Sequence, residues 1–246
     1  MDVIPSNWYE DWFGNEYLTL YAHRDEKEAR KLINLVRQNI NLKSDAQIID
    51  LCCGQGRHAH ILAELGYHVV GVDLSKTLLE VAKFNHSFSG SARFVQSDMR
   101  LLPFNHSFDL LLNLFTSFGY FDSDIENQSV FLQFGQALKQ DGWFVFDYIN
   151  DKHVRDNLVK SQNEKIGNIL IELERYISHE RVEKKITMTQ DSKKSIFYES
   201  VKMYPPDKIQ KMMMQAELKI DKVLGDYDGS PFLADSPRLI IIGSKK

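Results

Sequence analysis

The stretch "IIDLCCGQGRHAHILAELG" (Ile48–Gly66) decides the fold expected for this chain. An apolar run that ends in an acid predicts a short buried strand, and the residues after the glycines have the apolar spacing of a helix. Gly54 and Gly56, between the two, allow a sharp turn and the close approach of a ligand. The loop is consistent with a phosphate cradle, a redox or metal-binding cysteine pair, or a site for another charged small molecule.

Strand-like and helical segments alternate around this stretch. The predicted helices are 24–40, 56–65, 77–86 and 127–138, and the predicted strands are 47–53, 68–75, 92–98, 108–115 and 143–149. Asp141 and Gly142 predict a turn before the last of these strands. This alternation predicts a parallel sheet with right-handed crossovers. The near-continuous apolar run of 108–115 is typical of a strand that is covered on both faces.

The pattern changes after Asn150. Three strand-like stretches follow one another, at 168–177, 181–190 and 195–204, and predict an antiparallel insert over 151–204. A helix over 205–218 and strands over 219–227 and 238–245 complete the chain, and the close spacing of the last two predicts an antiparallel final strand.

The expected fold is therefore α/β and Rossmann-like. It has a seven-stranded sheet whose last strand is antiparallel, helices on both faces, and an antiparallel β insert after the fifth strand. We expect two domains: a main domain over 1–150 and 205–246, and the insert over 151–204.

The composition limits the classes of function. The chain has 246 residues, 43% hydrophobic and 26% charged, with a formal net charge of −4, which does not favour nucleic acid as a partner. It has no apolar run of the roughly 18 residues that a membrane-spanning helix needs, and its N-terminus lacks the basic start and apolar core of a secretory signal. The two cysteines are adjacent, which indicates a reducing compartment, and we expect a cytoplasmic protein.

The glycine loop can be compared with known motifs. A dinucleotide site has G-x-G-x-x-G, and here Ala59 stands at the third glycine, an allowed variant, whereas a Walker-type loop is excluded because no G-K-[ST] is present. Small buried cysteines in a turn are commoner than a metal pair. His58 and His60 are two apart on a helix and so face different ways, which makes a shared metal difficult. We therefore expect no metal, and a solvated or capping role for the two histidines.

Acidic or amide residues end four successive predicted strands. Asp50, Asp73, Asp98 and Asn113 fall at the carboxyl edge of the sheet, where ligands of open α/β sheets bind. Asp73 can accept hydrogen bonds from ribose hydroxyls and Asp98 from an adenine amino group, although Asp73 can also be a helix cap and Asp98 a turn residue. So much negative charge suits a pyrophosphate poorly and suits a nucleoside with a cationic centre.

The motifs together resemble those of class I S-adenosylmethionine-dependent methyltransferases. "IIDLCCGQGRHA", "VVGVDLS", "FVQSDMRLLPF" and "FDLLLNLFTSFGYF" look like motifs I to IV. "YLTLYAHRDEKEA" and "GDYDGSPFLADSPRLIIIGSKK" are similar to a bacterial small-molecule subgroup of unassigned substrate, so the resemblance covers nearly the whole chain. One departure is Cys52, where the usual motif I has its first glycine.

The resemblance implies S-adenosyl-L-methionine as cofactor and S-adenosyl-L-homocysteine as product. It implies an N-terminal helical cap, and His23 close to the cofactor. The cofactor-binding residues that it implies are Tyr17, Tyr21, Arg24, Cys52, Gly54, Gly56, Asp73, Leu74, Asp98, Met99, Asn113 and Leu114.

The resemblance also implies methyl transfer to a small-molecule acceptor by in-line displacement, with the insert covering the acceptor site. The aromatic residues of "TSFGYF" (116–121), among them Phe118 and Tyr120, belong either to the core or to an acceptor pocket. Arg175 and Arg238 are candidates for binding an acidic acceptor, and the alternative role for Arg238 is to tie down the C-terminal loop. Candidates for a general base are Tyr120, Tyr148, His153 and His23, and a reaction without an essential base stays open.

Other classes of function stay open. A nicotinamide oxidoreductase has a similar sheet, a protein of this fold can bind the cofactor without catalysis, and a nucleic-acid methyltransferase is disfavoured by the charge. We expect no nucleic-acid or membrane partner, and both a monomer and a homodimer are compatible with the sequence.

Overall fold

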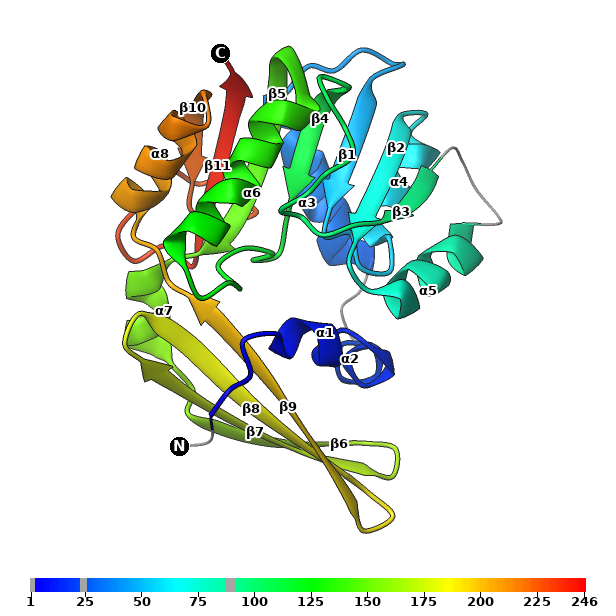
Figure 1. The fold of residues 1–246 in the computed structure, drawn as a ribbon, viewed down its shortest axis with the longest axis vertical. Coiled ribbons are helices and arrows are strands. Elements are labelled where there is room, and N and C mark those ends of the chain that lie inside the picture. Colours follow the sequence, from blue (N-terminus) through cyan, green and yellow to red (C-terminus); the bar gives the residue numbers. More distant parts are fainter. Residues whose placement is uncertain (1–2, 23–25, 87–91) are drawn as a thin grey trace.

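The computed structural model describes residues 3–22, 26–86 and 92–246. Two sheets make up the molecule: a larger one flanked by helices and a smaller antiparallel one, with short N-terminal helices between them (Figure 1). None of the helices in these residues is both long and apolar enough to cross a membrane.

The larger sheet has the order β10-β11-β5-β4-β1-β2-β3. All neighbouring strands are parallel except that β11 runs antiparallel to both β5 and β10. The fold expected from the sequence is thereby confirmed, including the direction of the last strand. The strands are β1 (Gln47–Leu51), β2 (His68–Asp73), β3 (Ala92–Gln96), β4 (Phe108–Asn113), β5 (Leu138–Ile149), β10 (Leu218–Leu224) and β11 (Arg238–Lys245).

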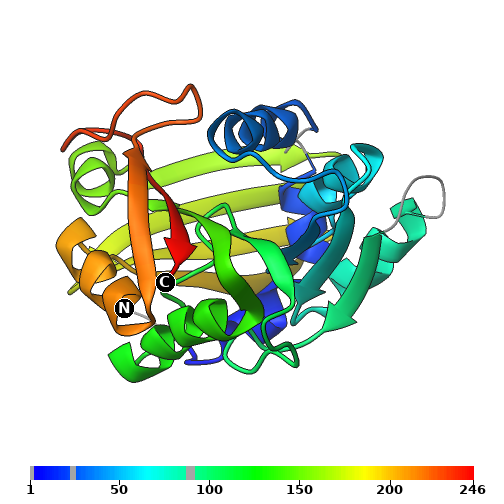
Figure 2. The same ribbon diagram turned by 90° about the horizontal axis from the view of Figure 1, so that it is seen from above.

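Helices cover both faces of this sheet because alternate strand residues face opposite ways. Leu110 and Leu112 of β4 pack with α3 and α4, and Leu111 packs with α6 and α8 on the other face (Figures 1 and 2). The helices are α3 (Glu26–Asn39), α4 (Arg57–Glu64), α5 (Lys76–His86), α6 (Asp124–Ala137) and α8 (Pro206–Gln215).

β5 begins earlier than the sequence predicts. Asp141 and Gly142, expected to form a turn before the strand, lie inside it, where the pairing with β4 shifts register between Phe108 and Leu110. Asp141 takes a left-handed conformation with φ 58° at this irregularity. The two residues that predict a turn therefore form a local irregularity within a continuous strand.

The insert forms the second sheet, in the order β6-β7-β8-β9. It begins with α7 (Asp151–Asn157), and its strands are β6 (Ser161–Ile166), β7 (Ile169–Ser178), β8 (Arg181–Gln190) and β9 (Lys193–Lys202). Three strands were expected, so the prediction missed β6 and also α7. β6 is a polar, mostly exposed edge strand, and its sequence lacks the alternation of apolar residues that marks a half-buried strand.

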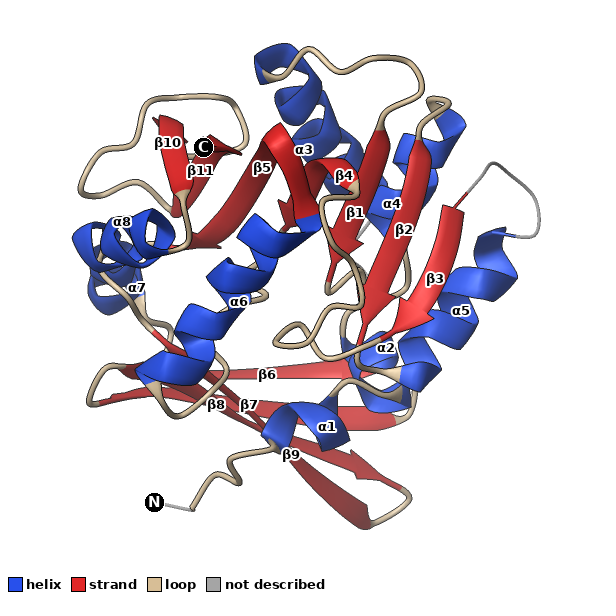
Figure 3. Ribbon diagram, turned by 45° about the horizontal axis from the view of Figure 1, so that its top comes forward, coloured by secondary structure: helices blue, strands red, loops and turns tan. Residues whose placement is uncertain are grey.

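The N-terminal helices α1 (Trp8–Trp12) and α2 (Asn15–Leu20) lie between the two sheets (Figure 3). The Trp12 ring packs against Phe197 of β9 at 5.2 Å, and its Nε1 donates a 2.9 Å hydrogen bond to Glu199 of the same strand. On the other side, Ser75 Oγ donates a 2.6 Å bond to the carbonyl of Phe13. The N-terminal segment is thus bonded to both sheets.

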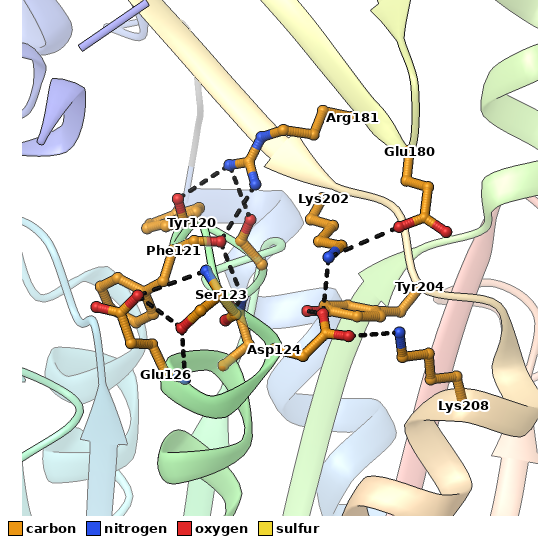
Figure 4. A network of polar contacts seen from close by, with 12 residues as sticks. Tyr120, Phe121, Ser123, Asp124, Glu126, Glu180, Arg181, Lys202, Tyr204 and Lys208 are labelled. Atoms are coloured by element: carbon orange, nitrogen blue, oxygen red, sulfur yellow. Dashed lines mark hydrogen bonds and ion pairs between the residues drawn. The ribbon is translucent and has the colours of Figure 1, made fainter. Parts of the chain in front are cut away.

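Arg181 of β8 attaches the insert to the loop that follows β4 (Figure 4). Its guanidinium donates to the carbonyls of Tyr120 (2.9 Å), Phe121 (3.2 Å) and Gly119 (3.3 Å), and to Oγ of Ser200 (2.7 Å). Nearby, Asp124 of α6 accepts bonds from three side chains at and after the end of β9, those of Lys202, Tyr204 and Lys208.

Replacing Arg181 with alanine should therefore destabilise the protein by about 2–3 kcal/mol, since several charge-assisted bonds to carbonyls are lost together. Urea denaturation measures this cost. Arg37→Ala, at an exposed position of α3, is the control and should stay within about 0.5 kcal/mol of the wild type. Equal effects of the two changes would show that Arg181 does not hold the insert.

Candidate active site

A cavity of about 600 Å³ lies between the carboxyl edge of the larger sheet, the N-terminal helices and the insert. Most of the residues predicted for the site line it. These are Tyr17, Tyr21, Cys52, Gly54, Asp73, Leu74, Asp98, Met99, Leu114, Tyr120, His153, Arg175 and Arg238. The cavity therefore joins the predicted cofactor end to the insert.

Four predicted residues do not line the cavity. Gly56 packs tightly inside the loop, where a Cβ would lie 3.0 Å from the Phe94 ring. Asn113 is fully buried and donates from Nδ2 to the Ser117 carbonyl at 3.1 Å. Phe118 and Tyr148 are fully buried in the core, with ring centroids 5.7 Å apart.

Two further predicted residues, His23 and Arg24, lie outside the described residues.

The loop between β1 and α4 is shaped by left-handed backbone. Cys52, Gly54 and Gly56 have φ of 60°, 56° and 79°, a region that favours glycine. Cys52, which stands where the usual motif has its first glycine, adopts the same left-handed conformation. The loop therefore keeps its shape, at the cost of some backbone strain at Cys52. Burial raises the pKa of both Cys52 and Cys53 well above the ordinary value, so the thiols stay protonated and unreactive.

Asp73 holds this loop in place. Its Oδ2 accepts the backbone N–H of Gly54 at 2.8 Å, and its Oδ1 accepts the N–H of Ser75 at 2.8 Å. Ser75 Oγ accepts the N–H of Leu78 at 3.1 Å, so the serine supplies the side-chain bond at the start of α5. Asp73 links the ends of β1 and β2 and has oxygen lone pairs left for a ligand.

Asp98 is held by a neighbouring cation. Arg100 donates to both carboxylate oxygens, from Nε at 3.1 Å and from an η nitrogen at 2.6 Å, and also bonds Glu126 at 2.7 Å. Burial alone would raise the pKa of Asp98, but the Arg100 bonds outweigh it and hold the pKa below its ordinary value. The carboxylate is fixed and ionised at the cavity wall.

Asp50 and His58 also line the cavity, and both are buried. Burial, together with the nearby Asp73 carboxylate, raises the pKa of Asp50 to about 7. Burial, with some help from the charge of Arg57, lowers the pKa of His58 to about 3, so the ring is neutral. Among the described residues, Asp50 Oδ2 and His58 Nε2 have no hydrogen-bond partner.

Neither of these two residues was among the site residues predicted from the sequence. The solvated role considered for His58 is wrong, because the residue is only 6% exposed. The sequence placed Asp50 among the polar residues at the strand ends, directly before the glycine loop, but assigned it no ligand.

Arg238 pairs with a buried acid. It donates from Nε to Asp147 Oδ1 at 2.8 Å and from an η nitrogen to Thr116 Oγ1 at 2.9 Å. Asp147 is fully buried and also accepts bonds from the N–H of Phe115 and the hydroxyl of Tyr227. The guanidinium therefore ties β11 to β5 and to the loop after β4.

The cavity wall near the insert contains both aromatic and polar side chains. The Tyr120 ring packs on Trp8 and Phe13, with centroids 5.1 and 5.9 Å away, and burial raises its pKa well above the ordinary value. His153 of α7 has Nδ1 3.0 Å from the Asp235 carbonyl. Within "TSFGYF", Tyr120 thus lines the cavity while Phe118 belongs to the core.

A polar cluster on the insert joins this wall to α2. Lys184 donates to Glu199 at 2.5 Å and to the Tyr21 hydroxyl at 2.6 Å, and that hydroxyl donates to Glu199 at 2.8 Å. The sequence prediction included Tyr21 but missed Lys184 and Glu199, which are 15 residues apart and meet only through strand pairing.

No group of three or more His, Cys, Asp or Glu side chains within residues 3–22, 26–86 and 92–246 is arranged to hold a metal ion.

Comparison with known proteins identifies the family. A family model described as "Methyltransferase domain" matches residues 42–216, and the chain belongs to this family. The segment that resembles "Putative methyltransferase YqeM" of Bacillus subtilis (strain 168) is 31% identical over 136 residues, 55% of this chain and 53% of the relative. "Putative methyltransferase GWCH70_2453" of Geobacillus sp. (strain WCH70) is 32% identical over 128 residues, 50% and 52% of the two chains. The chain thus spans about half the length of the curated relatives it matches.

Solved structures share the fold. An S-adenosylmethionine-dependent methyltransferase from Clostridium acetobutylicum ATCC 824 has a TM-score of 0.80 and 21% identity, covering 94% of this chain and 98% of that one. CalS10 of Micromonospora echinaspora, an amino pentose methyltransferase solved with S-adenosylmethionine bound, has a TM-score of 0.69 and 16% identity, covering 94% and 97%. The family and fold expected from the sequence are confirmed, and the cofactor bound in CalS10 is the one that the sequence motifs imply.

The pKa of Asp50 gives a prediction for stability. The pKa of the Asp50 carboxyl is about 7 in the folded state, above its ordinary value of 3.8, so the folded protein binds this proton more tightly than the unfolded chain does. The contribution of the carboxyl to the free energy of unfolding is therefore full at low pH and is lost as the pH rises toward 7. Between pH 5 and pH 8, the unfolding free energy of Asp50→Asn should therefore gain roughly 2–3 kcal/mol relative to the wild type.

Urea denaturation of both proteins across this pH range measures the difference. Groups that titrate in both proteins, such as His58, cancel in the comparison. Parallel stability curves for the two proteins would show that Asp50 is ionised in the folded state throughout.

Proposed function

We propose that this chain transfers a methyl group from S-adenosylmethionine to a small-molecule acceptor. One observation carries the proposal: a single cavity runs from the glycine loop, held by Asp73, to the wall of the insert. A cofactor at one end and an acceptor at the other would then meet inside it. Membership of the methyltransferase family agrees with this arrangement.

The residues at the loop end fit the cofactor. Asp50 has a buried carboxylate oxygen without a hydrogen-bond partner among the described residues, which suits the ammonium group of the methionine part. Asp73 suits the ribose hydroxyls, because each of its oxygens can accept more than the one N–H bond described above. Leu74, Asp98 and Met99 form the adjoining wall, where the adenine would lie.

The chain's contribution to the reaction is alignment and exclusion of water. When bound, the cofactor supplies a methyl group on a sulfonium, which is a good leaving group for in-line displacement. Alignment of the two reactants is worth roughly 7–11 kcal/mol. The rings of Tyr17 and Tyr120 line the cavity and would favour a nearby cation by about 0.5–2 kcal/mol each.

A general base is required only when the acceptor arrives protonated. Tyr120 suits this role poorly because burial keeps its phenol protonated, and Tyr148 is enclosed in the core. Of the described candidates, His153 remains, on α7 at the insert end of the cavity.

Calorimetric titration of the purified protein with S-adenosylmethionine, S-adenosylhomocysteine and NADH tests the proposal. We expect micromolar binding of the first two and none of the third. Binding of NADH alone would favour the oxidoreductase alternative, and cofactor binding without turnover of any acceptor would favour a non-catalytic protein.

Asp73→Ala should weaken binding of S-adenosylhomocysteine by about ten- to a hundredfold, since charge-assisted hydrogen bonds worth about 1.5–3 kcal/mol are lost. The same calorimetry measures the effect, and circular dichroism verifies that the variant is folded. Asp228→Ala, at an exposed loop position, is the control and should bind as the wild type does. If Asp73→Ala binds S-adenosylhomocysteine as tightly as the wild type, Asp73 does not bind the ribose hydroxyls.

A further inference from the structure

We propose that the methyl acceptor carries a carboxylate, and that Arg175 binds it at the insert end of the cavity. This inference rests on the proposed function and adds the chemical class of the substrate. It follows from how charges are placed across the inner face of the insert sheet.

Three charged residues stand side by side on this sheet. Arg175 of β7 pairs directly with Lys184 of β8, which pairs directly with Glu199 of β9. Residues paired in this way project from the same face of the sheet, and all three line the cavity. The row therefore presents two cations and one acid to the cavity.

Glu199 neutralises only one of the two cations. Its carboxylate is 2.5 Å from the Lys184 ammonium, and it also accepts bonds from Trp12 and Tyr21. The Glu199 carboxylate is thus paired with Lys184 and hydrogen-bonded to the N-terminal segment. Arg175 is left beside a like charge on the neighbouring strand, a pairing that is unfavourable by itself.

The contacts of the Arg175 guanidinium are with neutral oxygens. It donates to the Val159 carbonyl at 3.3 Å and to Gln162 Oε1 at 3.2 Å. Both distances are at the long end of the range for hydrogen bonds, and a guanidinium has five N–H donors. A carboxylate can accept two of these donors at once and would supply the missing negative charge.

The surrounding wall favours a carboxylate over a phosphate. Glu199 also lines the cavity, so a dianion would meet more repulsion from this acid than a monoanion would. Besides polar residues such as His153, Asn157 and Gln162, the lining from α7 and the insert includes five apolar residues: Val154, Leu158, Val159, Val182 and Val201. The predicted acceptor is an acid with an apolar or aromatic body.

The test uses the protein saturated with S-adenosylhomocysteine. Binding of 4-hydroxybenzoate, 4-aminobenzoate, indole-3-acetate and 3-(4-hydroxyphenyl)propionate is measured by calorimetry, each beside its neutral primary amide, with phenyl phosphate as a phosphate probe. We expect at least one acid to bind about tenfold or more tightly than its amide. Arg175→Gln should remove that preference while leaving the affinity for S-adenosylhomocysteine within about twofold.

Lys194→Gln is the matched control, because it removes one positive charge from an exposed position of the same sheet. It should keep the preference for the acid. The proposal is wrong if no acid binds more tightly than its amide, if Arg175→Gln keeps the preference, or if phenyl phosphate binds more tightly than every acid. Failure of the proposed function is distinguished by two further results. A wild type that does not bind S-adenosylhomocysteine lacks the cofactor site, and one that binds an acid but does not methylate it when S-adenosylmethionine is supplied is a non-catalytic protein.

Discussion

The buried carboxylate of Asp147 is the constraint on which the cavity wall depends. Four groups from three separate segments converge on it: the backbone of Phe115, the hydroxyl of Tyr227 and the two donors of Arg238. Leaving such a charge unpaired costs about 3–5 kcal/mol, so the segments must come together for the fold to be stable. Phe115 and Thr116, both with positive φ, are held in that conformation beside the cavity.

Much of the larger sheet could be predicted because its strands and helices carry strong local patterns. The run Ile48–Asp50 before a glycine loop, and the leucines of β4, mark strands that are buried on both faces. β6 could not be found in this way, since an exposed edge strand is defined by its partner and not by burial. The bulge at Asp141 resembles a turn because both use left-handed backbone, and only pairing with β4 distinguishes them.

The candidate site was predictable to the extent that its residues follow a strand end. Asp73 and Asp98 were found by this rule, and both line the cavity. The sequence could not assign Phe118 to the core and Tyr120 to the cavity, because the residues are two apart in an irregular loop. Pairs such as Arg238 with Asp147, 91 residues apart, arise from tertiary packing alone.

The N-terminal helices have a kinetic consequence. Through Phe13 they are bonded to the helix that follows β2, and through Trp12 to the insert, so they connect the two walls of the cavity. Displacing this one segment would open the cofactor end and the acceptor end together. Under the proposed function, both products would leave past this one segment, and the rate of its displacement would then set an upper limit on turnover however fast the chemical step is.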